Sequence, residues 1–463
     1  MPPGSANAQM NGTKLSMEFP LPFITDYSGE LFCVDLSKYK TPGFQLPNFD
    51  EEGVIFKKPM KFSITKFRDN FDGTQMLCHG STSADRWCEA LHIGFVNGHF
   101  VMQTKAHYLF PPSFLSLSSR APPFDSPNDQ LISEPIITNL DLHEVAVGSV
   151  SKDEAAFFAS AGKYRHTSED ILYNFLVPTY QTIKSLSYKK FDKFRFFCRD
   201  MRELENNMIL INSITKQPPR EPDVSNTLTI IDYVILGLKK ADDNCDNTRS
   251  AQEKYGHIYG FTYKNTKGFR EEVLTHFGFD VNHNNSHPYI IYTEDDNMKV
   301  LNRDRILMYI KESCGFCDLK IIDIKSEKNL TNLIHEFSRA NVIIGRFGVG
   351  LENALWMPKG GHMIEIRPIH FWCNDKYQVA AKIAGLQYHK VMNIGNILEL
   401  IPKYDGIENQ RKQDTCYSTE SYCESDECYE FLRDQETSVE IETFGETWKM
   451  VLEDLKQNFS GLK

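Results

Sequence analysis

The residues Asn341–Pro368, NVIIGRFGVGLENALWMPKGGHMIEIRP, are the most informative part of this chain for its fold. The run Asn341–Ile344 is short, apolar and β-branched, as are strands inside a parallel sheet. Three glycines follow closely, Leu351–Met357 then indicates one or two helical turns, and Met363–Ile366 is again strand-like. A strand, a glycine-rich turn, a helix and a second strand predict a βα unit of an α/β protein.

The glycine-rich turn also suggests a ligand. Glycines between a strand and a helix let the backbone approach a ligand closely, and the first N–H groups of a helix have no partner within it. These N–H groups and the helix dipole together hold a phosphate without a basic side chain. The turn therefore predicts a nucleotide-phosphate site at Gly348, Val349 and Gly350, with Asn353 close behind them. An ordinary tight βα turn is the alternative.

The same alternation continues on both sides of this stretch and predicts a parallel, Rossmann-like sheet. Leu330–Ala340 shows the pattern well, because its apolar residues have the spacing of an amphipathic helix. The other elements expected in the C-terminal half are strands at Tyr289–Tyr292, Lys320–Ile324 and Leu386–Val391, and helices at Arg303–Cys314, Asp375–Ala384 and Glu446–Asn458.

Patterns in the first half of the chain are weaker. Short strand-like runs near Cys78 and Cys88 predict a small β unit joined by these cysteines. A helix is expected from about Ser168, with Pro178 kinking or ending it. The remaining expectations are strands at Lys61–Phe67, His92–Val96, His99–Gln103, Asn207–Ile214 and Leu228–Leu236, an α/β unit over 140–245, and a polar link over Cys245–Phe279.

The bulk composition narrows the class of protein. The chain has 463 residues, enough for two or three domains with a sizeable core. Its net charge of −11 argues against nucleic acid as the principal partner, because phosphate binding requires a basic surface. No window approaches 18 consecutive apolar residues, and the start, MPPGSANAQMNGTKLSMEF, lacks the pattern of a signal peptide. We expect either a cytoplasmic protein or one whose membrane anchor or leader is absent from this sequence.

Eleven cysteines bear on the compartment. Cys416, Cys423 and Cys428 lie in a polar, acidic segment where they make poor core residues, so disulfides in an oxidising compartment are expected. Cys314 and Cys317 form a CxxC pair, for which a zinc site is the alternative. Sequons at Asn11, Asn284, Asn329 and Asn458 fit a lumenal protein, although an Asn-rich chain also produces them by chance.

The stretch Ala340–Glu365 resembles glycosyltransferase family 61, which includes the EGF-domain O-GlcNAc transferase, the protein O-mannose β-1,4-N-acetylglucosaminyltransferase and plant xylan arabinosyl- and xylosyltransferases. Two other segments resemble the family in the same order, namely Lys299–Leu307 (KVLNRDRIL) and Cys78–Cys88 (CHGSTSADRWC). The resemblance spans residues 75–460. The positions that match in the glycine-rich stretch are Gly345, Gly348, Gly350, Leu351, Asn353, Leu355, Pro358, Gly360 and Glu365.

This resemblance implies a GT-B-like α/β fold with two facing Rossmann-like domains and a C-terminal helix that returns to the N-terminal half. It implies inverting transfer of a sugar, GlcNAc or a pentose, from a UDP-sugar to a protein or glycan hydroxyl, with no metal cofactor, in the lumen of the endoplasmic reticulum or Golgi. The corresponding divisions are an extension (1–58), an acceptor-side domain (59–250), a nucleotide-sugar-binding domain (251–410), and an acidic tail with a closing helix (411–463).

Candidate donor-site residues follow from the turn and the resemblance. Backbone N–H groups of the turn and the Lys299 ammonium are expected to stabilise the departing diphosphate. Glu365 is a candidate acceptor for ribose or sugar hydroxyls, with a structural role as the alternative. The full set is Lys299, Asn302, Arg346, Phe347, Gly348, Val349, Gly350, Asn353 and Glu365.

The catalytic base is expected in the first half of the chain. Family members carry His-x-x-x-Asp at the start of a helix, and this chain has His166 and Asp170 at that spacing. A second register, set by Pro178, places Asp170 at the His position and Asn174 at the Asp position. Both registers keep Asp170 as a candidate for proton abstraction from the acceptor hydroxyl.

Three departures from the family pattern leave alternatives open. Phe347 replaces the family's glycine-loop His, a basic residue is missing just before Lys299, and Glu294-Asp295-Asp296 stands where an Arg is expected. A catalytically inactive relative that binds or scaffolds is therefore a second hypothesis. The acidic run is either a solvated turn or a site for Mg²⁺ or Mn²⁺. An unrelated dinucleotide-binding protein is the weakest alternative, since a GxGxxG motif is absent.

Overall fold

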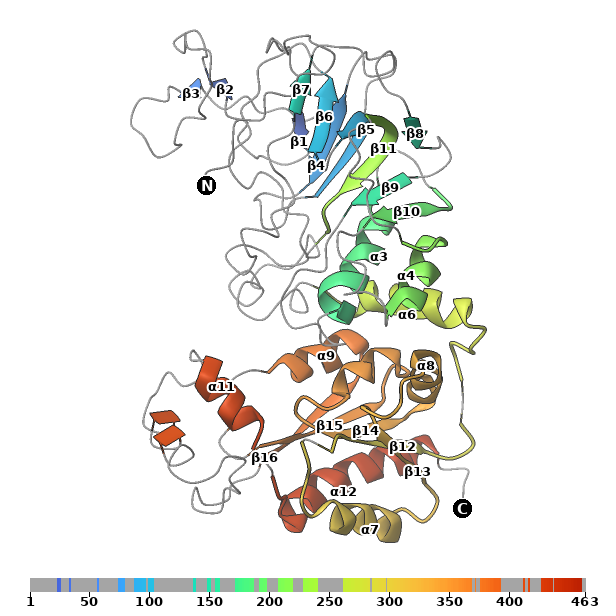
Figure 1. The fold of residues 1–463 in the computed structure, drawn as a ribbon. Coiled ribbons are helices and arrows are strands. Elements are labelled where there is room, and N and C mark those ends of the chain that lie inside the picture. The colour runs from blue at the N-terminus through green and yellow to red at the C-terminus, as the bar shows by residue number, and fades with distance from the viewer. Residues whose placement is uncertain are drawn as a thin grey trace. The chain divides into compact units, whose positions relative to one another are not determined.

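The computed structural model shows a mixed α/β protein that divides into two compact units, Met1–Gly260 and Phe261–Lys463 (Figure 1). The residues that the structure describes are 23–25, 33–34, 56–57, 74–79, 87–96, 99–103, 136–138, 148–150, 155–158, 171–186, 191–197, 207–219, 228–239, 261–283, 285–296, 298–368, 371, 375–392, 411–412, 415–416, 426–435 and 437–459.

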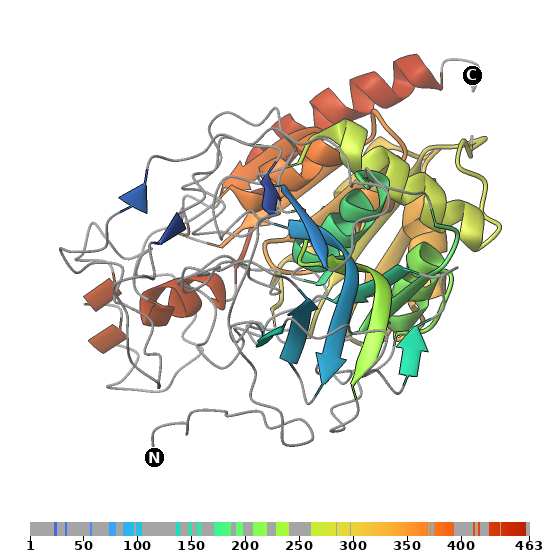
Figure 2. The same cartoon turned by 90° about the horizontal axis from the view of Figure 1, so that it is seen from above.

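The first unit contains a mixed sheet built around two long antiparallel strands, β5 (Trp87–Val96) and β11 (Thr229–Leu236). β4 (Gln75–His79) pairs with the other edge of β5, and these three strands run side by side in Figure 2 as well. β9 (Ala155–Phe158) continues the sheet parallel to β11, and β10 (Phe194–Phe197) pairs with β9. The other strands of this sheet are β1 (Phe23–Thr25), β6 (His99–Gln103), β7 (Ile136–Thr138) and β8 (Gly148–Val150). A separate pair joins β2 (Cys33–Val34) and β3 (Phe56–Lys57).

This arrangement differs from the sequence prediction in two respects. The expected small β unit and the α/β unit over 140–245 share one sheet, because β5 pairs with β11. The expected strand Asn207–Ile214 is instead helix α4, Met208–Thr215. Its buried apolar residues Leu210, Ile211 and Ile214 lie at the i, i+1, i+4 spacing of one helix face, with Ser213 and Thr215 buried beside them, and a run rich in Ile and Leu conceals this spacing. The expected strand Lys61–Phe67 lies outside the described residues.

Pro178 does not end its helix. A π-helical turn, η2 (Leu172–Leu176), leads directly into α3 (Val177–Lys184), with the proline in the first turn of α3. Proline lacks an N–H and crowds the preceding turn, and a π-turn accommodates both effects without breaking the helix. Both segments are buried except at the end of α3.

The second unit confirms the predicted parallel sheet. Its five strands are all parallel and lie in the order β13-β12-β14-β15-β16. The strands are β12 (Tyr289–Glu294), β13 (Asp318–Asp323), β14 (Val342–Arg346), β15 (His362–Arg367) and β16 (Gln387–Met392). The connecting helices are α7 (Arg303–Ser313), α8 (Leu330–Arg339), the 3₁₀ segment η5 (Leu351–Trp356) and α9 (Lys376–Ala384).

Helices cover both faces of this sheet (Figure 1). Alternate residues of β12, β14 and β15 pack with α7 and α12 (Ile441–Asn458) in one apolar cluster that includes Trp448. On the other face α8, α9 and η5 pack together, and α6 (Tyr263–His276) lies against α9 and η5. The expected polar link over Cys245–Phe279 therefore contains a helix, whose buried Phe269 and Val273 belong to the core of this unit.

The C-terminal helix α12 packs within the second unit, against α7 and β16. The family resemblance implied that this helix also returns to the N-terminal half, and that stays a prediction. A polar chain reinforces its packing, because His362 Nε2 lies 2.9 Å from Asp454 Oδ2 and His362 Nδ1 lies 3.1 Å from His389 Nε2. Trp448 Nε1 also donates to Ser313 Oγ (2.8 Å). The apolar face of α12 is thus buried inside its own unit.

Candidate nucleotide-binding site

The glycine-rich turn joins β14 to η5. Gly348 and Gly350 have φ angles of +85° and +71°, which L side chains rarely adopt. The Val349 N–H donates to the Arg346 carbonyl (3.0 Å), and the N–H and Nδ2 of Asn353 both donate to the Gly350 carbonyl (3.1 Å each). The turn is therefore held in one conformation, and the Asn353 side chain is part of its construction.

Close packing explains two of the glycines. A Cβ at Gly350 would lie 2.6 Å from Ile324 Cγ1 and 3.1 Å from Thr293 Cγ2. A Cβ at Gly345 would lie 3.0 Å from the Val349 carbonyl oxygen. Thr293 also binds the turn, since its Oγ1 donates to that same carbonyl (2.7 Å). The end of β12 is thus joined directly to the turn that follows β14.

The turn lies where the strand order of the sheet reverses. The chain runs from β12 outward to β13 and returns to β14 on the other side of β12. Open α/β sheets bind ligands beyond the carboxyl ends of their strands at such a point. A Cβ at Gly348 would lie 3.7 Å from the methyl group of Met298, a residue that follows β12. Residues from both strand ends therefore meet here.

Two backbone donors are free at this position. Within the described residues, the N–H groups of Gly348 and Gly350 have no hydrogen-bond partner. Backbone N–H groups are obligatory hydrogen-bonding groups, so two unused ones in a glycine turn are suited to an anionic ligand. Of the three turn residues whose N–H groups the sequence predicted as phosphate donors, Gly348 and Gly350 keep this possibility, whereas the Val349 N–H is bonded to the Arg346 carbonyl.

Side chains after β12 carry both signs of charge. Lys299 Nζ lies 3.1 Å from Asp296 Oδ1, and Arg303 Nε lies 3.1 Å from Glu294 Oε2. The Lys299 side chain is 54% exposed, so its ammonium can exchange this partner for another anion at little cost. Two members of the acidic run are thus paired with cations. Among the described residues, no three His, Cys, Asp or Glu side chains form a group suited to a metal ion.

Arg346 and Asn302 are engaged elsewhere. The Arg346 side chain is 1% exposed, and its Nη2 donates to the carbonyl oxygens of Arg433 (2.6 Å) and Gln435. The Asn302 amide binds Val439 in both directions, donating to its carbonyl (2.5 Å) and accepting from its N–H (3.0 Å). Both residues hold the segment that connects α11 (Asp426–Arg433) to α12.

Glu365 belongs to a buried ionic network at the end of β15. Its carboxylate is fully buried, accepts from Arg367 Nε (2.8 Å) and accepts from the Tyr388 hydroxyl (2.5 Å). Arg367 Nη2 in turn donates to Asp375 Oδ1 (2.9 Å). Burial raises the pKa of Glu365, an effect that Arg367 and Tyr388 oppose. These contacts favour the structural role for Glu365, which the sequence left as an alternative.

Phe347 lies in an aromatic cluster rather than at the surface. Its fully buried ring lies 4.6 Å from the Phe371 ring and 5.1 Å from the Tyr377 ring, centroid to centroid. Two cations lie over the same ring, since Lys376 Nζ is 5.0 Å and the Arg367 guanidinium carbon 5.8 Å from its centroid. A residue that follows β14 is thus surrounded by positive charge as well as by aromatic rings.

Lys376 is a candidate that the sequence did not suggest. It is half-buried in the first turn of α9, and its ammonium lies over the ring of the residue next to Gly348. The signal available in the sequence was only its place near the start of a helix, which many lysines share. Its proximity to the turn depends on how α9 packs beside β14, so only the fold reveals it.

The sequence offers two registers for the catalytic base. His166 and Asp170 lie outside the described residues. Asn174, the partner in the second register, is buried within η2. Asn174 has an interaction partner within the chain, as expected for a buried polar residue.

Cysteine chemistry fits an oxidising compartment. Cys314 is bonded to Cys317, which overturns the zinc alternative for this pair, and Cys416 is bonded to Cys428. Cys88 is also disulfide-bonded, and in the ladder between β4 and β5 its backbone lies opposite that of Cys78. Disulfides persist mainly in secreted and lumenal proteins. In the part of the chain that the structure describes, no helix is both long and apolar enough to cross a membrane.

Comparison with known protein families finds no family model that matches this chain, and comparison with curated proteins finds no match.

Proposed function

We propose that this protein is an inverting glycosyltransferase that moves a sugar, GlcNAc or a pentose, from a UDP-sugar to a protein or glycan hydroxyl. One observation carries the proposal. A glycine turn with two unused N–H groups lies at the strand-order reversal of a parallel sheet, within a sequence that resembles the donor loop of glycosyltransferase family 61. The proposal includes a fold of the GT-B type and a location in the lumen of the endoplasmic reticulum or Golgi.

In this proposal the second unit binds the nucleotide. The N–H groups of Gly348 and Gly350 bind diphosphate oxygens, and the ammonium groups of Lys299 and Lys376 add counter-charge. The residues so used come from three places in the unit, after β12, after β14 and at the start of α9. His166 and Asp170 remain the proposed candidates for the base that takes the proton of the acceptor hydroxyl.

A catalytically inactive relative is the second candidate function, and a specific observation favours it. Phe347 stands at the place of the family's His and is buried among aromatic rings, and Arg346 is bound to backbone carbonyls. Donors that stabilise a developing charge are worth about 3 kcal/mol each in catalysis, so losing them slows transfer more than it weakens binding. Such a protein binds a nucleotide-sugar without turning it over.

The first experiment measures binding of UDP to the full chain by calorimetry, with and without Mn²⁺. We expect metal-independent binding that Gly348→Val weakens about tenfold or more. Gly360→Val is the matched control, because Gly360 has a similar φ (+87°) and lies at the amino-terminal end of β15, away from the turn. Absence of UDP binding, or equal affinities of the two variants, refutes the nucleotide site.

Turnover then separates the two candidate functions. A panel of UDP-sugars is incubated with the protein, and release of UDP is followed without an acceptor and with candidate protein and glycan acceptors. Release that depends on one sugar supports the transferase. Tight UDP binding with no release from any donor supports the inactive relative. A requirement for Mn²⁺ in either assay contradicts the metal-independent mechanism and returns attention to Glu294, Asp295 and Asp296.

A further inference from the structure

The sequon at Asn329 is complete within the described part of the chain. Asn329, Leu330 and Thr331 open helix α8, and both Asn329 and the preceding Lys328 are exposed. Of the four sequons, it is the one whose three residues the structure describes throughout. Its surroundings can therefore be compared with the requirements of N-glycosylation, which attaches a glycan to the Asn side-chain nitrogen at an exposed position.

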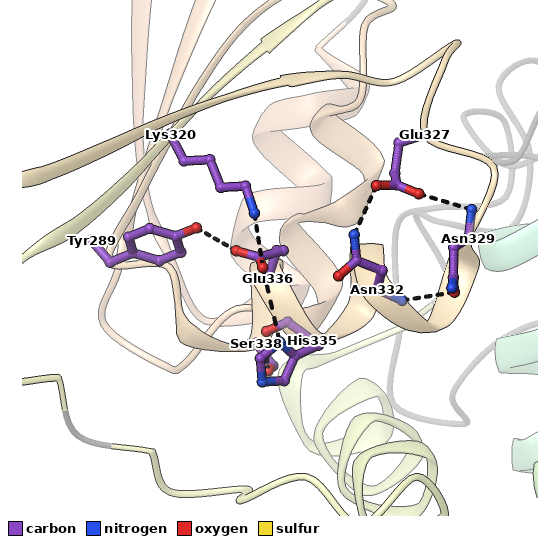
Figure 3. A network of polar contacts seen from close by, with 8 residues as sticks. All are labelled: Tyr289, Lys320, Glu327, Asn329, Asn332, His335, Glu336 and Ser338. Atoms are coloured by element: carbon purple, nitrogen blue, oxygen red, sulfur yellow. Dashed lines mark hydrogen bonds and ion pairs between the residues drawn. The ribbon is translucent and has the colours of Figure 1, made fainter.

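The two ends of the Asn329 amide have different roles. Oδ1 caps α8 by accepting the N–H of Asn332 (3.0 Å), as Figure 3 shows. Within the described residues, Nδ2 has no partner. A glycan replaces one hydrogen of Nδ2 and leaves Oδ1 unchanged, so the helix cap and the modification can coexist on one side chain.

The start of α8 is fixed by its neighbours. The Glu327 carboxylate accepts from the Asn329 N–H (2.9 Å) and from Asn332 Nδ2 (2.7 Å). Further along the helix, Glu336 binds the Tyr289 hydroxyl and lies 2.9 Å from Lys320 Nζ, which attaches α8 to β12 and β13 (Figure 3). The exposed amide is thus presented from a rigid position.

Asn458 offers a contrast within the same unit. It also lies in a sequon and is exposed, but its Nδ2 donates to Asp454 Oδ2 (3.0 Å). That carboxylate oxygen is the one that contacts His362. A glycan on Asn458 would crowd the polar chain that holds α12, whereas one on Asn329 displaces no hydrogen bond of the described residues.

We propose that Asn329 is an N-glycosylation site. The donor is an oligosaccharide linked through a diphosphate to a lipid. A C–N bond forms between Asn329 Nδ2 and the first sugar carbon, the C–O bond to the diphosphate breaks, the amide loses one proton, and the lipid diphosphate departs with the bonding electrons. The disulfides at Cys314–Cys317 and Cys416–Cys428 support passage through a compartment where this chemistry occurs.

The test expresses the full chain behind a cleavable leader in eukaryotic secretory cells. Peptide mapping with N-glycosidase treatment then shows whether Asn329 carries a glycan. Detection of the Cys416–Cys428 disulfide in the same protein confirms passage through the lumen. We expect a glycan at Asn329 in the wild type and in Thr331→Ser. We expect its loss, as one discrete step in gel mobility, in Thr331→Ala, which keeps the helix cap. Disulfide-bonded wild-type protein whose Asn329 is unmodified overturns the proposal.

Discussion

Gly350→Ala is the most direct test of why the turn after β14 requires glycine. The substitution imposes two costs, a side chain at a φ of +71° and a Cβ within 2.7 Å of two Ile324 carbons. Gly278→Ala imposes only the first, because Gly278 has a φ of +73° and its Cβ would meet no atom within 4 Å. Both glycines lie in the second unit, so the pair separates backbone strain from steric overlap.

The expected magnitudes differ clearly between the two variants. A left-handed conformation costs an L residue about 1–2 kcal/mol, which is the whole effect expected for Gly278→Ala. Overpacking a filled site adds about 1–3 kcal/mol. Gly350→Ala should therefore lower the free energy of unfolding by about 2–5 kcal/mol. Ile324 is a side chain rather than backbone, so its movement decides where in this range the value falls.

Urea unfolding followed by fluorescence measures the difference. With an m value of about 2 kcal/mol per M, an extra loss of about 2 kcal/mol lowers the midpoint by about 1 M beyond that of Gly278→Ala. In the Ile324→Ala background the overlapping side-chain atoms are gone. Gly350→Ala should therefore lower the free energy of unfolding less in that background than it does in the wild type. Equal midpoints for Gly350→Ala and Gly278→Ala would refute the steric argument.

Asn329→Ala removes the oxygen that caps α8 and should lower the free energy of unfolding of the unglycosylated protein by about 1 kcal/mol. Asn329→Asp keeps an acceptor and should lose less. Equal losses for the two variants in urea titrations would contradict the role of Asn329 as a helix cap. Glu365→Ala leaves the buried Arg367 guanidinium without its buried carboxylate and should cost about 3–5 kcal/mol, and a double-mutant cycle with Arg367→Met should show coupling. Burial, with the neighbouring His362, lowers the pKa of His389 to about 4. The unfolded chain takes up that proton near pH 6.5, so the free energy of unfolding should fall as the pH drops from about 6.5 to about 4. Titrations at stepped pH should show a shallower fall in His389→Gln, and an identical fall in both proteins contradicts this assignment.

Local pattern was sufficient for most of the second unit. Leu330–Arg339 carries the spacing of an amphipathic helix in its own residues, and Val342–Ile344 of β14 is apolar because both faces of a central parallel strand are covered. Asn207–Ile214 was predicted as a strand and is helical, because Ile and Leu in a short run suit either structure. In so short a run, periodicity distinguishes a helix from a strand only when the burial of each residue is known.

The residues of the candidate site also fall into those that local sequence identifies and those whose roles depend on distant parts of the chain. A glycine-rich turn between a strand and a helix is a local property, so the sequence by itself determined Gly348 and Gly350 as candidates. The roles of Arg346 and Asn302 were decided by tertiary structure, because their partners Arg433 and Val439 lie far along the chain and reach them only after folding.

The sequence by itself thus determined the parallel βα alternation and the glycine turn of the second unit, since both follow from the spacing of neighbouring residues. Only the tertiary structure decided which polar side chains remain available for a ligand. It binds Glu365 to Tyr388 and Arg346 to the carbonyl of Arg433, and it places Lys376 over the ring of Phe347. The physical reason is that a buried polar group must find a partner, and the fold determines which groups are buried together.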